Sequence, residues 1–278
     1  MTFAPRLKRG AVLADVTSAN IVGYQTIAAP AANHYISLSV QFTSLDGIPK
    51  TVSNLFTYAS GSPKARPGFG TQADNLWLWD PSLNNGAGSW AKFWYKSAAG
   101  TLPAGWYKQG VATVPASDPV PDGSTVLFFR GTYTGVADAA TLQLAGGVHP
   151  LNGKVQQTDL QCNKYRFICY PWPVEFNINK LAACQANPKA RPGFGTQADN
   201  VWIWDPTLNN GAGSWAKFWY RTGGSTWSAG WYKQGDTTKL ADFPIPAGEG
   251  FLFFRGTYGE QIPETITFKG PEYVEPAQ

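Results

Sequence analysis

Four aspartates are the residues in this chain whose type and spacing could do chemistry. Asp74 and Asp80 lie six residues apart, and Asp199 and Asp205 repeat that spacing. Two carboxylates held about 5–9 Å apart are the arrangement that glycoside hydrolysis requires. In an extended strand, a separation of six residues places two side chains about 20 Å apart. The spacing therefore argues against a catalytic pair and favours aspartates that cap turns.

Calcium binding is an alternative use of the second aspartate in each pair. Asp80 with Asn84 offers oxygen ligands, and Asp205 with Asn209 repeats them. Calcium takes six to eight such ligands, but the spacing of an EF-hand loop is absent. We therefore predict no cofactor and no metal site, and we keep Ca²⁺ as the alternative to turn capping.

The other groups that could act as bases or nucleophiles follow no catalytic pattern. Only two histidines exist, His34 and His149, and neither recurs at a matching position. The sequence contains no GxSxG, HExxH, paired-cysteine or Walker motif. The glycine-rich stretch 66–70 lacks the Lys-Ser/Thr that follows a phosphate-binding loop. We expect no catalytic residues and a protein that is not an enzyme.

Aromatic side chains are a stronger indication of function than the carboxylates and histidines are. In the segment 91–96, alternation places Lys92, Trp94 and Lys96 on one face of a strand. Ammonium groups seldom point into a core, so Trp94 should lie on a polar face, as should its copy Trp219. There each ring is either covered by a loop of its own module or stacks on a partner subunit or a sugar ring.

We expect contacts with a partner or glycan to come from aromatic and basic side chains present twice in the chain. They are Phe69, Trp90, Trp94, Trp106, Lys92 and Arg66 in one copy, and Phe194, Trp215, Trp219, Trp231, Lys217 and Arg191 in the other. Two of these tryptophans in each copy adjoin glycine-rich turns, where a ring can be exposed. Trp77 and Trp79 we assign instead to a core or to covering a sheet.

An internal repeat must position all of these residues. Residues 63–96 recur at 188–221 with four substitutions in 34 positions, at an offset of 125. The offset holds further along, since Gly105–Gly110 and Leu127–Tyr133 also return. A fixed period of this kind sets the architecture, so the chain is expected to present nearly the same surface twice.

The repeated unit has the pattern of an all-β domain. In NLWLWD, Leu76 and Leu78 face one way, and the substitution of both by β-branched residues in the second copy is typical of a core-facing side. Turn residues then lead into a partner strand at 90–96, which predicts a hairpin with a long loop. Further strands are expected at 18–27, 34–42, 126–130 and 141–144, and one short helical turn at 178–184.

We therefore predict two tandem β-sandwich-like domains related by internal duplication. The expected bounds are an N-terminal arm at 1–17, a first domain at 18–147 and a second at 148–278. Two domains of this size agree with the length of 278 residues, and each is long enough to bury a core.

The amino-acid composition bears on whether nucleic acid, a membrane or another protein is the partner of this chain. Charged residues make up 14%, against about 25% in typical soluble proteins, while aromatic residues also make up 14%. The net charge of +4 is too small to argue for nucleic acid, and no apolar stretch approaches the roughly 18 residues of a membrane span. Low charge and many aromatics suit a protein that buries surface against partners.

The three cysteines, Cys162, Cys169 and Cys184, lie at the start of the second copy and have no counterpart in the first. The repeated function therefore needs no thiol. Cys162 and Cys169 cannot pair if one continuous strand holds both, because seven residues of strand span about 23 Å. One disulfide involving Cys184 and three reduced thiols both remain open.

The second copy resembles a β-rich module of bacterial exported surface and adhesin-type proteins. The likeness lies in the order KYRFICYPWPVEFNINKL, DNVWIWDP, GWYKQG, IPAGEGFLFF and ETITFKG, and the first copy matches at SANIVGYQTI, LWLWDP, VPDGSTVLFF and TLQLAGG. Similar modules occur in exported proteins of planctomycete and verrucomicrobial type. The resemblance implies a β-sandwich located outside the cell or on its surface and used for structure or adhesion.

Two functions follow from these patterns. The first is a non-enzymatic structural subunit that self-assembles into an extracellular filament, tube or surface lattice, with Met1–Val16 adding a strand to a neighbour. The alternative is a bivalent carbohydrate-binding adhesin that gains avidity from twin sites. A lattice protein would bury Trp94 and Trp219 between chains, whereas an adhesin would hold them in an open groove.

Overall fold

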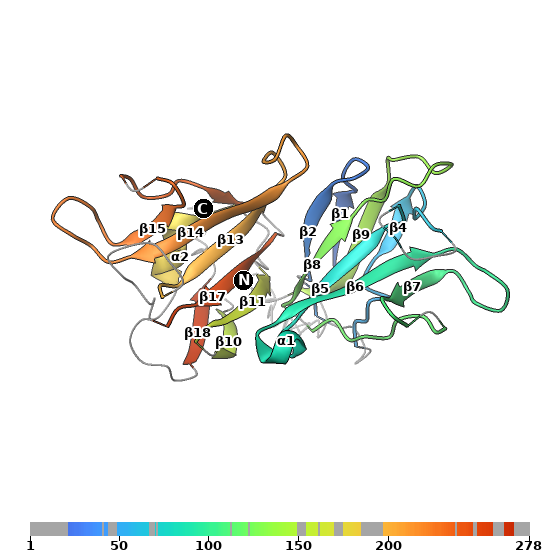
Figure 1. The fold of residues 1–278 in the computed structure, drawn as a ribbon, viewed down its shortest axis with the longest axis horizontal. Helices are drawn as coiled ribbons and strands as arrows, with labels where there is room; N and C mark the ends of the chain where they lie inside the picture. The colour runs from blue at the N-terminus through green and yellow to red at the C-terminus, as the bar shows by residue number, and fades with distance from the viewer. Residues whose placement is uncertain are drawn as a thin grey trace, which may run out of the picture.

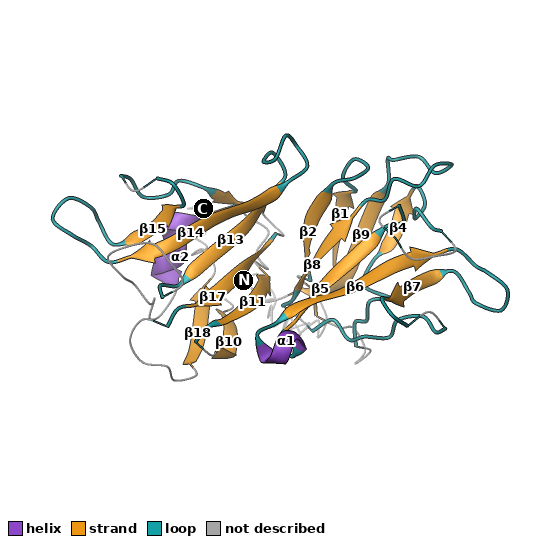
Figure 2. Cartoon of the chain, viewed as in Figure 1, coloured by secondary structure: helices purple, strands orange, loops and turns teal. Residues whose placement is uncertain are grey.

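The computed structural model shows an all-β protein (Figures 1 and 2). It describes residues 22–40, 42–43, 49–66, 70, 72–111, 113–121, 123–148, 154–160, 162–169, 175–184, 197–236, 238–246, 249–257 and 264–269. The expected N-terminal arm at 1–17 lies outside these residues. Two halves lie beside each other, with β5–β9 on one side of Figure 1 and β13–β15 on the other.

We call the half that holds β1–β9 module 1 and the half that holds β10–β18 module 2. Each module is built on a five-stranded antiparallel sheet, and the two sheets have equivalent strands in the same order. In module 1 the order is β2 (Tyr35–Ser39), β8 (Thr125–Phe129), β5 (Asn75–Asp80), β6 (Ser89–Lys96) and β7 (Gly105–Lys108). In module 2 it is β11 (Lys164–Cys169), β17 (Gly250–Arg255), β13 (Asn200–Asp205), β14 (Ser214–Arg221) and β15 (Gly230–Lys233).

The second layer differs between the modules. In module 1, β9 (Thr141–Val148) pairs with β1 (Val22–Ala28), β3 (Phe42–Thr43) and β4 (Thr57–Ser60). In module 2, β18 (Glu264–Lys269) pairs with β10 (Lys154–Leu160), while β12 (Phe176–Asn177) pairs with β16 (Pro244–Ile245) beside helix α2 (Ile178–Cys184). The helical turn expected at 178–184 is confirmed.

The hairpin of β5 and β6 forms as predicted, and glycine and asparagine shape its loop. The turn labelled α1 (Leu83–Gly86) is not a regular helix, because Asn84 and Asn85 have φ values of 54°. Asn209 and Asn210 repeat this left-handed conformation with φ of 53° and 55°. Asparagine is among the few residues with a side chain that tolerate it.

One face of each five-stranded sheet covers an aliphatic core. Leu76, Phe93 and Phe128 pack with Leu142 and Leu144 of β9, which closes module 1 as a sandwich. The equivalent face of module 2 packs on α2 through Ile178 and Leu181. Leu76 and Leu78 are both buried, so the core-facing side predicted from alternation is confirmed.

A buried ion pair ties the strands of each module together. In module 1, Arg130 Nη1 donates to Asp74 Oδ2 at 2.7 Å, and neither side chain is exposed. Asp74 also accepts hydrogen bonds from the backbone N–H of Lys64 and Gly131 and from the Tyr58 hydroxyl, at 2.8–2.9 Å. Burial, followed by the charge of Asp74, raises the pKa of Tyr58 far above its usual value.

Module 2 repeats the pair, with Arg255 Nη1 at 2.7 Å from Asp199 Oδ2 and the Gly256 N–H at 2.9 Å from Oδ1. The expectation that Asp74 and Asp199 cap turns was therefore incomplete. Each neutralises a buried arginine that lies 56 residues away in the chain. This partner could not be identified from local spacing.

The variant Arg130→Met should lower the free energy of unfolding by about 3–5 kcal/mol, because it leaves the Asp74 carboxylate buried without its cation. Chemical denaturation measures this loss. Lys108→Met is the matched control, since it removes a cation from the more exposed Lys108–Asp118 pair and should cost less than about 1 kcal/mol. Equal losses in the two variants would contradict the structural role assigned to Arg130.

Candidate functional site

The face of each five-stranded sheet that looks away from the aliphatic core carries tryptophans. Trp77 and Trp79 alternate with Leu76 and Leu78 along β5, so they project from the opposite side. The aromatic faces of both modules join in one apolar cluster across the middle of the molecule. Its members are Leu127, Phe167 and Leu252, with Tyr35, Trp77, Trp79, Trp90, Tyr165, Trp202 and Trp215 packed against them.

The contacts between the two faces are reciprocal. The indole N–H of Trp79 donates to the Tyr165 carbonyl at 3.1 Å, and the indole N–H of Trp204 donates to the Tyr35 carbonyl at 3.2 Å. The rings of the same two pairs meet edge to face, with centroids 5.9 and 5.5 Å apart. Because residue i meets residue j on both sides, this is the geometry of a two-fold interface within one chain.

These indole donors also protect two sheet edges. β2 and β11 are the outermost strands of their five-stranded sheets. Tyr35 and Tyr165 lie on these strands, and each carbonyl is occupied by a tryptophan of the other module. Edge strands with free carbonyls are prone to pair with other chains, so the tryptophans cover them.

The two modules differ in sequence at the place in their interface where equivalent residues would otherwise meet. Thr125 and Gly250 hold equivalent positions, at the starts of β8 and β17. A Cβ atom on Gly250 would lie 2.0 Å from Thr125 Oγ1, so this position requires glycine. The Gly250 N–H instead donates to Ser37 Oγ at 3.2 Å, while the equivalent of Ser37 in module 2 is the bulky Phe167.

Trp90 and Trp215 both contact the ring of Phe167 in module 2. The Phe167 ring meets Trp90 of the other module edge to face at 5.4 Å and Trp215 of its own module at 5.9 Å. These two tryptophans were predicted to contact a partner. In the structure, the neighbour of Trp90 is the second module rather than a separate subunit.

The remaining predicted rings lie deeper than the sequence indicated. Trp106 and Trp231 belong to the aliphatic cores and are 4% and 0% exposed. Trp94 is buried at 8% exposure, and Trp219 is half-buried. The expectation of exposed rings is therefore corrected for Trp106 and Trp231, because these positions face the core side of β7 and β15.

Two of the predicted basic residues, Lys92 and Lys217, contact the aromatic face. The ammonium groups of Lys92 and Lys217 lie 4.3 and 4.2 Å from the ring centroids of Trp77 and Trp202, as cation–π contacts. Arg66 donates to Gln72 Oε1 at 3.0 Å. Three other predicted contact residues, Phe69, Arg191 and Phe194, lie outside the described residues.

The residues considered as calcium ligands form turns. Asp80 Oδ1 accepts hydrogen bonds from the Ser82 N–H and hydroxyl, and Asp205 Oδ1 accepts the same two bonds from Thr207. The Ser82 hydroxyl is the main cause that lowers the pKa of Asp80. Within the described residues, no group of three or more His, Cys, Asp or Glu side chains could hold a metal ion. This geometry favours turn capping.

Module 2 holds one unusual carboxyl group that the sequence reasoning missed. Glu249 directly precedes β17, beside the end of β13 where Asp205 lies. Burial, together with the charge of Asp205, raises the pKa of Glu249 to about 7. The offset of 125 places Ser124 at the same position in module 1, so this group does not belong to the repeated site.

The three cysteines lie on different elements, with Cys184 at the end of α2. Cys169 ends β11 and is fully buried, which raises the pKa of its thiol to about 12. Cys162 lies in the turn before that strand. A thiol held neutral in this way is a poor nucleophile.

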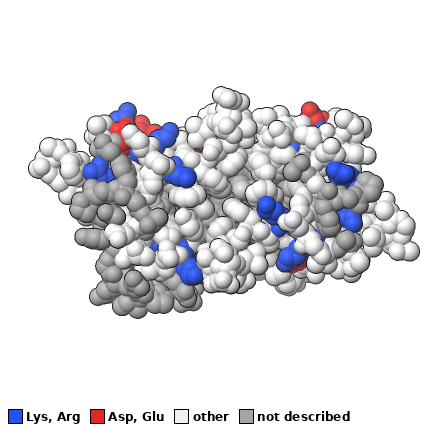
Figure 3. Space-filling view, in the orientation of Figure 1, with Lys and Arg blue, Asp and Glu red and all other residues white. Residues whose placement is uncertain are grey.

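The exterior is sparsely charged. On the face drawn in Figure 3, Lys and Arg side chains occupy separate positions rather than one continuous patch. Among the helices in the described part of the chain, none is long and apolar enough to cross a membrane.

The variant Glu249→Gln should stabilise the protein above pH 7. The folded protein holds the Glu249 proton more tightly than the unfolded chain does, so wild-type stability falls as pH rises from about 4.5 to about 7. The gain at pH 8 should reach at most roughly 3 kcal/mol and should shrink toward pH 4. Denaturation at both pH values measures it, with the exposed Glu175→Gln as control. A gain that does not depend on pH would contradict this account.

No family model matches the chain, and no curated protein sequence is significantly similar to it.

Proposed function

We propose that the chain is a non-enzymatic structural subunit that self-assembles outside the cell into a filament, tube or surface lattice. The observation that carries the proposal is the position of β1, the outermost strand of its sheet. Among the described residues, this seven-residue strand pairs with β9 alone. A neighbouring chain can add a strand to such an edge.

The hydrogen-bond register identifies which groups face the open edge. The Ala29 N–H donates to the Ala140 carbonyl at 2.9 Å, so Ala29 belongs to the hydrogen-bonded set that faces β9. Alternation assigns Gln25 and Ile27 to the same set and leaves the backbone groups of Tyr24 and Thr26 directed away from β9. The Tyr24 side chain is also 69% exposed, which adds apolar surface beside that edge.

The occupant we assign is the N-terminal arm of a second copy. Met1–Val16 precedes β1 in the chain. Sixteen extended residues reach about 50 Å, which is enough to extend from one molecule to the edge of another. Donor and acceptor then lie on different parts of each subunit, so the contact is head-to-tail, and such a contact builds an open assembly when its rotation does not close a ring.

The two modules give such an assembly a stiff repeating unit. Their aromatic faces are joined by two indole hydrogen bonds and by ring contacts on both sides of the interface. In module 2, β10 pairs with β18 as β1 pairs with β9, and within the described residues these two strands form a sheet of their own.

Bivalent glycan binding at Trp94 and Trp219 has less support from the geometry. That function needs both rings in open grooves with polar groups converging on them. Trp94 is only 8% exposed.

The variant Thr26→Pro should abolish polymers while leaving the fold intact. Proline removes an N–H that points to the open edge, and it is tolerated on edge strands because the ladder to β9 does not use that group. Negative-stain microscopy and light scattering of the full chain measure the assembly state, with Thr26→Ala as control. Removal of Met1–Val16 should have the same effect as Thr26→Pro. Wild-type polymers from either altered chain, or a wild-type chain that stays monomeric at every concentration, would overturn the proposal.

A further inference from the structure

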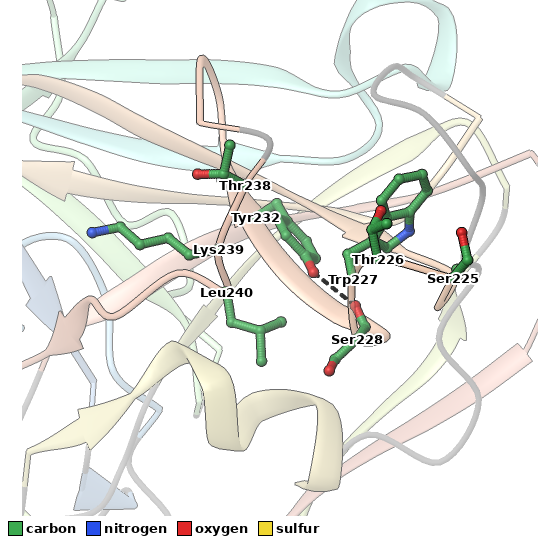
Figure 4. Close-up of a pocket in the computed structure, with 9 residues that line it drawn as sticks. Ser225, Thr226, Trp227, Ser228, Tyr232, Thr238, Lys239 and Leu240 are labelled. Atoms are coloured by element: carbon green, nitrogen blue, oxygen red, sulfur yellow. Dashed lines mark hydrogen bonds between the residues drawn. The ribbon is translucent and has the colours of Figure 1, made fainter.

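A hollow on module 2 combines an aromatic ring with a rim of hydroxyl groups. The loop 222–229 joins β14 to β15 and borders a cavity of about 400 Å³. Figure 4 shows Thr238 and Lys239 across this hollow from Trp227, with Tyr232 between them. A cavity of this size falls within the range of about 300–1,000 Å³ that is typical of ligand sites.

The Trp227 ring is fixed in place before any ligand arrives. Its indole N–H donates to the Thr222 carbonyl at 3.0 Å, and the Arg221 guanidinium lies 4.7 Å from the ring centroid. Gly224 permits this position, because a Cβ atom there would lie 2.7 Å from Trp227 Cε2. The ring remains partly exposed, so it is a preorganised and accessible apolar surface.

Polar groups surround this ring. Ser225, Thr226 and Ser228 flank it along the loop, and Thr238 and Lys239 approach from the facing segment. All five residues are exposed. The hollow therefore offers several hydroxyl groups and one ammonium group around a single aromatic surface.

Module 1 serves as an internal comparison. Its loop 97–104 has the same length, and the hydroxyl groups of Tyr107 and Tyr232 donate to the equivalent carbonyls of Pro103 and Ser228, both at 2.8 Å. The frame of the loop is thus shared. The lining residues differ, because Leu102, Pro103 and Val114 replace Trp227, Ser228 and Lys239 at the offset of 125. Module 1 keeps two rim hydroxyl groups, as Thr101 and Thr113, at the positions of Thr226 and Thr238. Module 2 alone carries the ring, the two serines and the lysine.

We propose that this hollow is a carbohydrate-binding site for a pyranose ring, located in module 2 only. The C–H face of a pyranose is apolar and would stack on Trp227, while its hydroxyl groups need donors and acceptors of the kind that the rim provides. The open shape of the hollow suits one unit of a longer glycan. The site is separate from the predicted rings Trp94 and Trp219 and from the open edge of β1.

The test is binding of soluble oligosaccharides to full-length protein. A glycan array that carries neutral and uronic-acid pyranose oligomers selects the probe, and titration calorimetry with the best tetrasaccharide gives the affinity. The variant Trp227→Leu installs the module 1 residue and should weaken binding at least tenfold without changing the thermal midpoint. The matched change Leu102→Trp in module 1 should add no second site, because Gly100, Pro103 and Val114 stand there in place of the two serines and the lysine of the rim.

Two further measurements keep the outcome decisive. Thr226→Ala with Ser228→Ala retains the ring and should also weaken binding, which covers the case in which Trp227→Leu fails to fold. Lys239→Met should reduce binding of uronic-acid oligomers more than that of neutral ones. No binding of any pyranose oligomer at millimolar concentration, or equal binding by wild type and Trp227→Leu, would overturn the proposal. Titration in the Thr26→Pro background separates this result from self-assembly.

Discussion

The contact between the two tryptophan faces is the constraint on which the rest of the structure depends. Each five-stranded sheet has two apolar sides, an aliphatic one that covers its own core and an aromatic one that it cannot cover alone. The tryptophans of these faces are half-buried, and the contact shields part of each ring from water. A separated module would expose its aromatic face to water. The pairing explains how a chain with 14% aromatic residues can be a compact folded body.

The same contact explains where the two copies are alike and where they differ. The strand Asn75–Asp80 and its loop recur almost unchanged because Trp79 and Trp204 make the same hydrogen bond in opposite directions. The loops that do not touch the sister module vary freely, as in the change from Leu102 to Trp227. The rule is not general, because Ser37 and Phe167 hold equivalent positions, differ in type and both contact the other module.

Local alternation was enough to predict the all-β class, the β5–β6 hairpin and its two faces. It could not reveal what covers the aromatic face, because Trp90 meets Phe167 through contacts distant in sequence. The pairing of Asp74 with Arg130 was missed for the same reason, although both residues recur at the offset of 125. Trp227 was not among the predicted contact residues, because those were chosen for being present in both copies. The counterpart of Trp227 in the first copy is Leu102.

The asymmetry at Thr125 and Gly250 determines which modules can associate. Two copies of module 1 brought together in the same way would set threonine against threonine, where even a glycine-bound Cβ is too close at 2.0 Å. Two copies of module 2 would place Phe167 where Ser37 now accepts the Gly250 N–H. Each module therefore selects its sister over itself. If two chains exchange modules during folding, each contact in the exchanged dimer should therefore still pair a module 1 of one chain with a module 2 of the other.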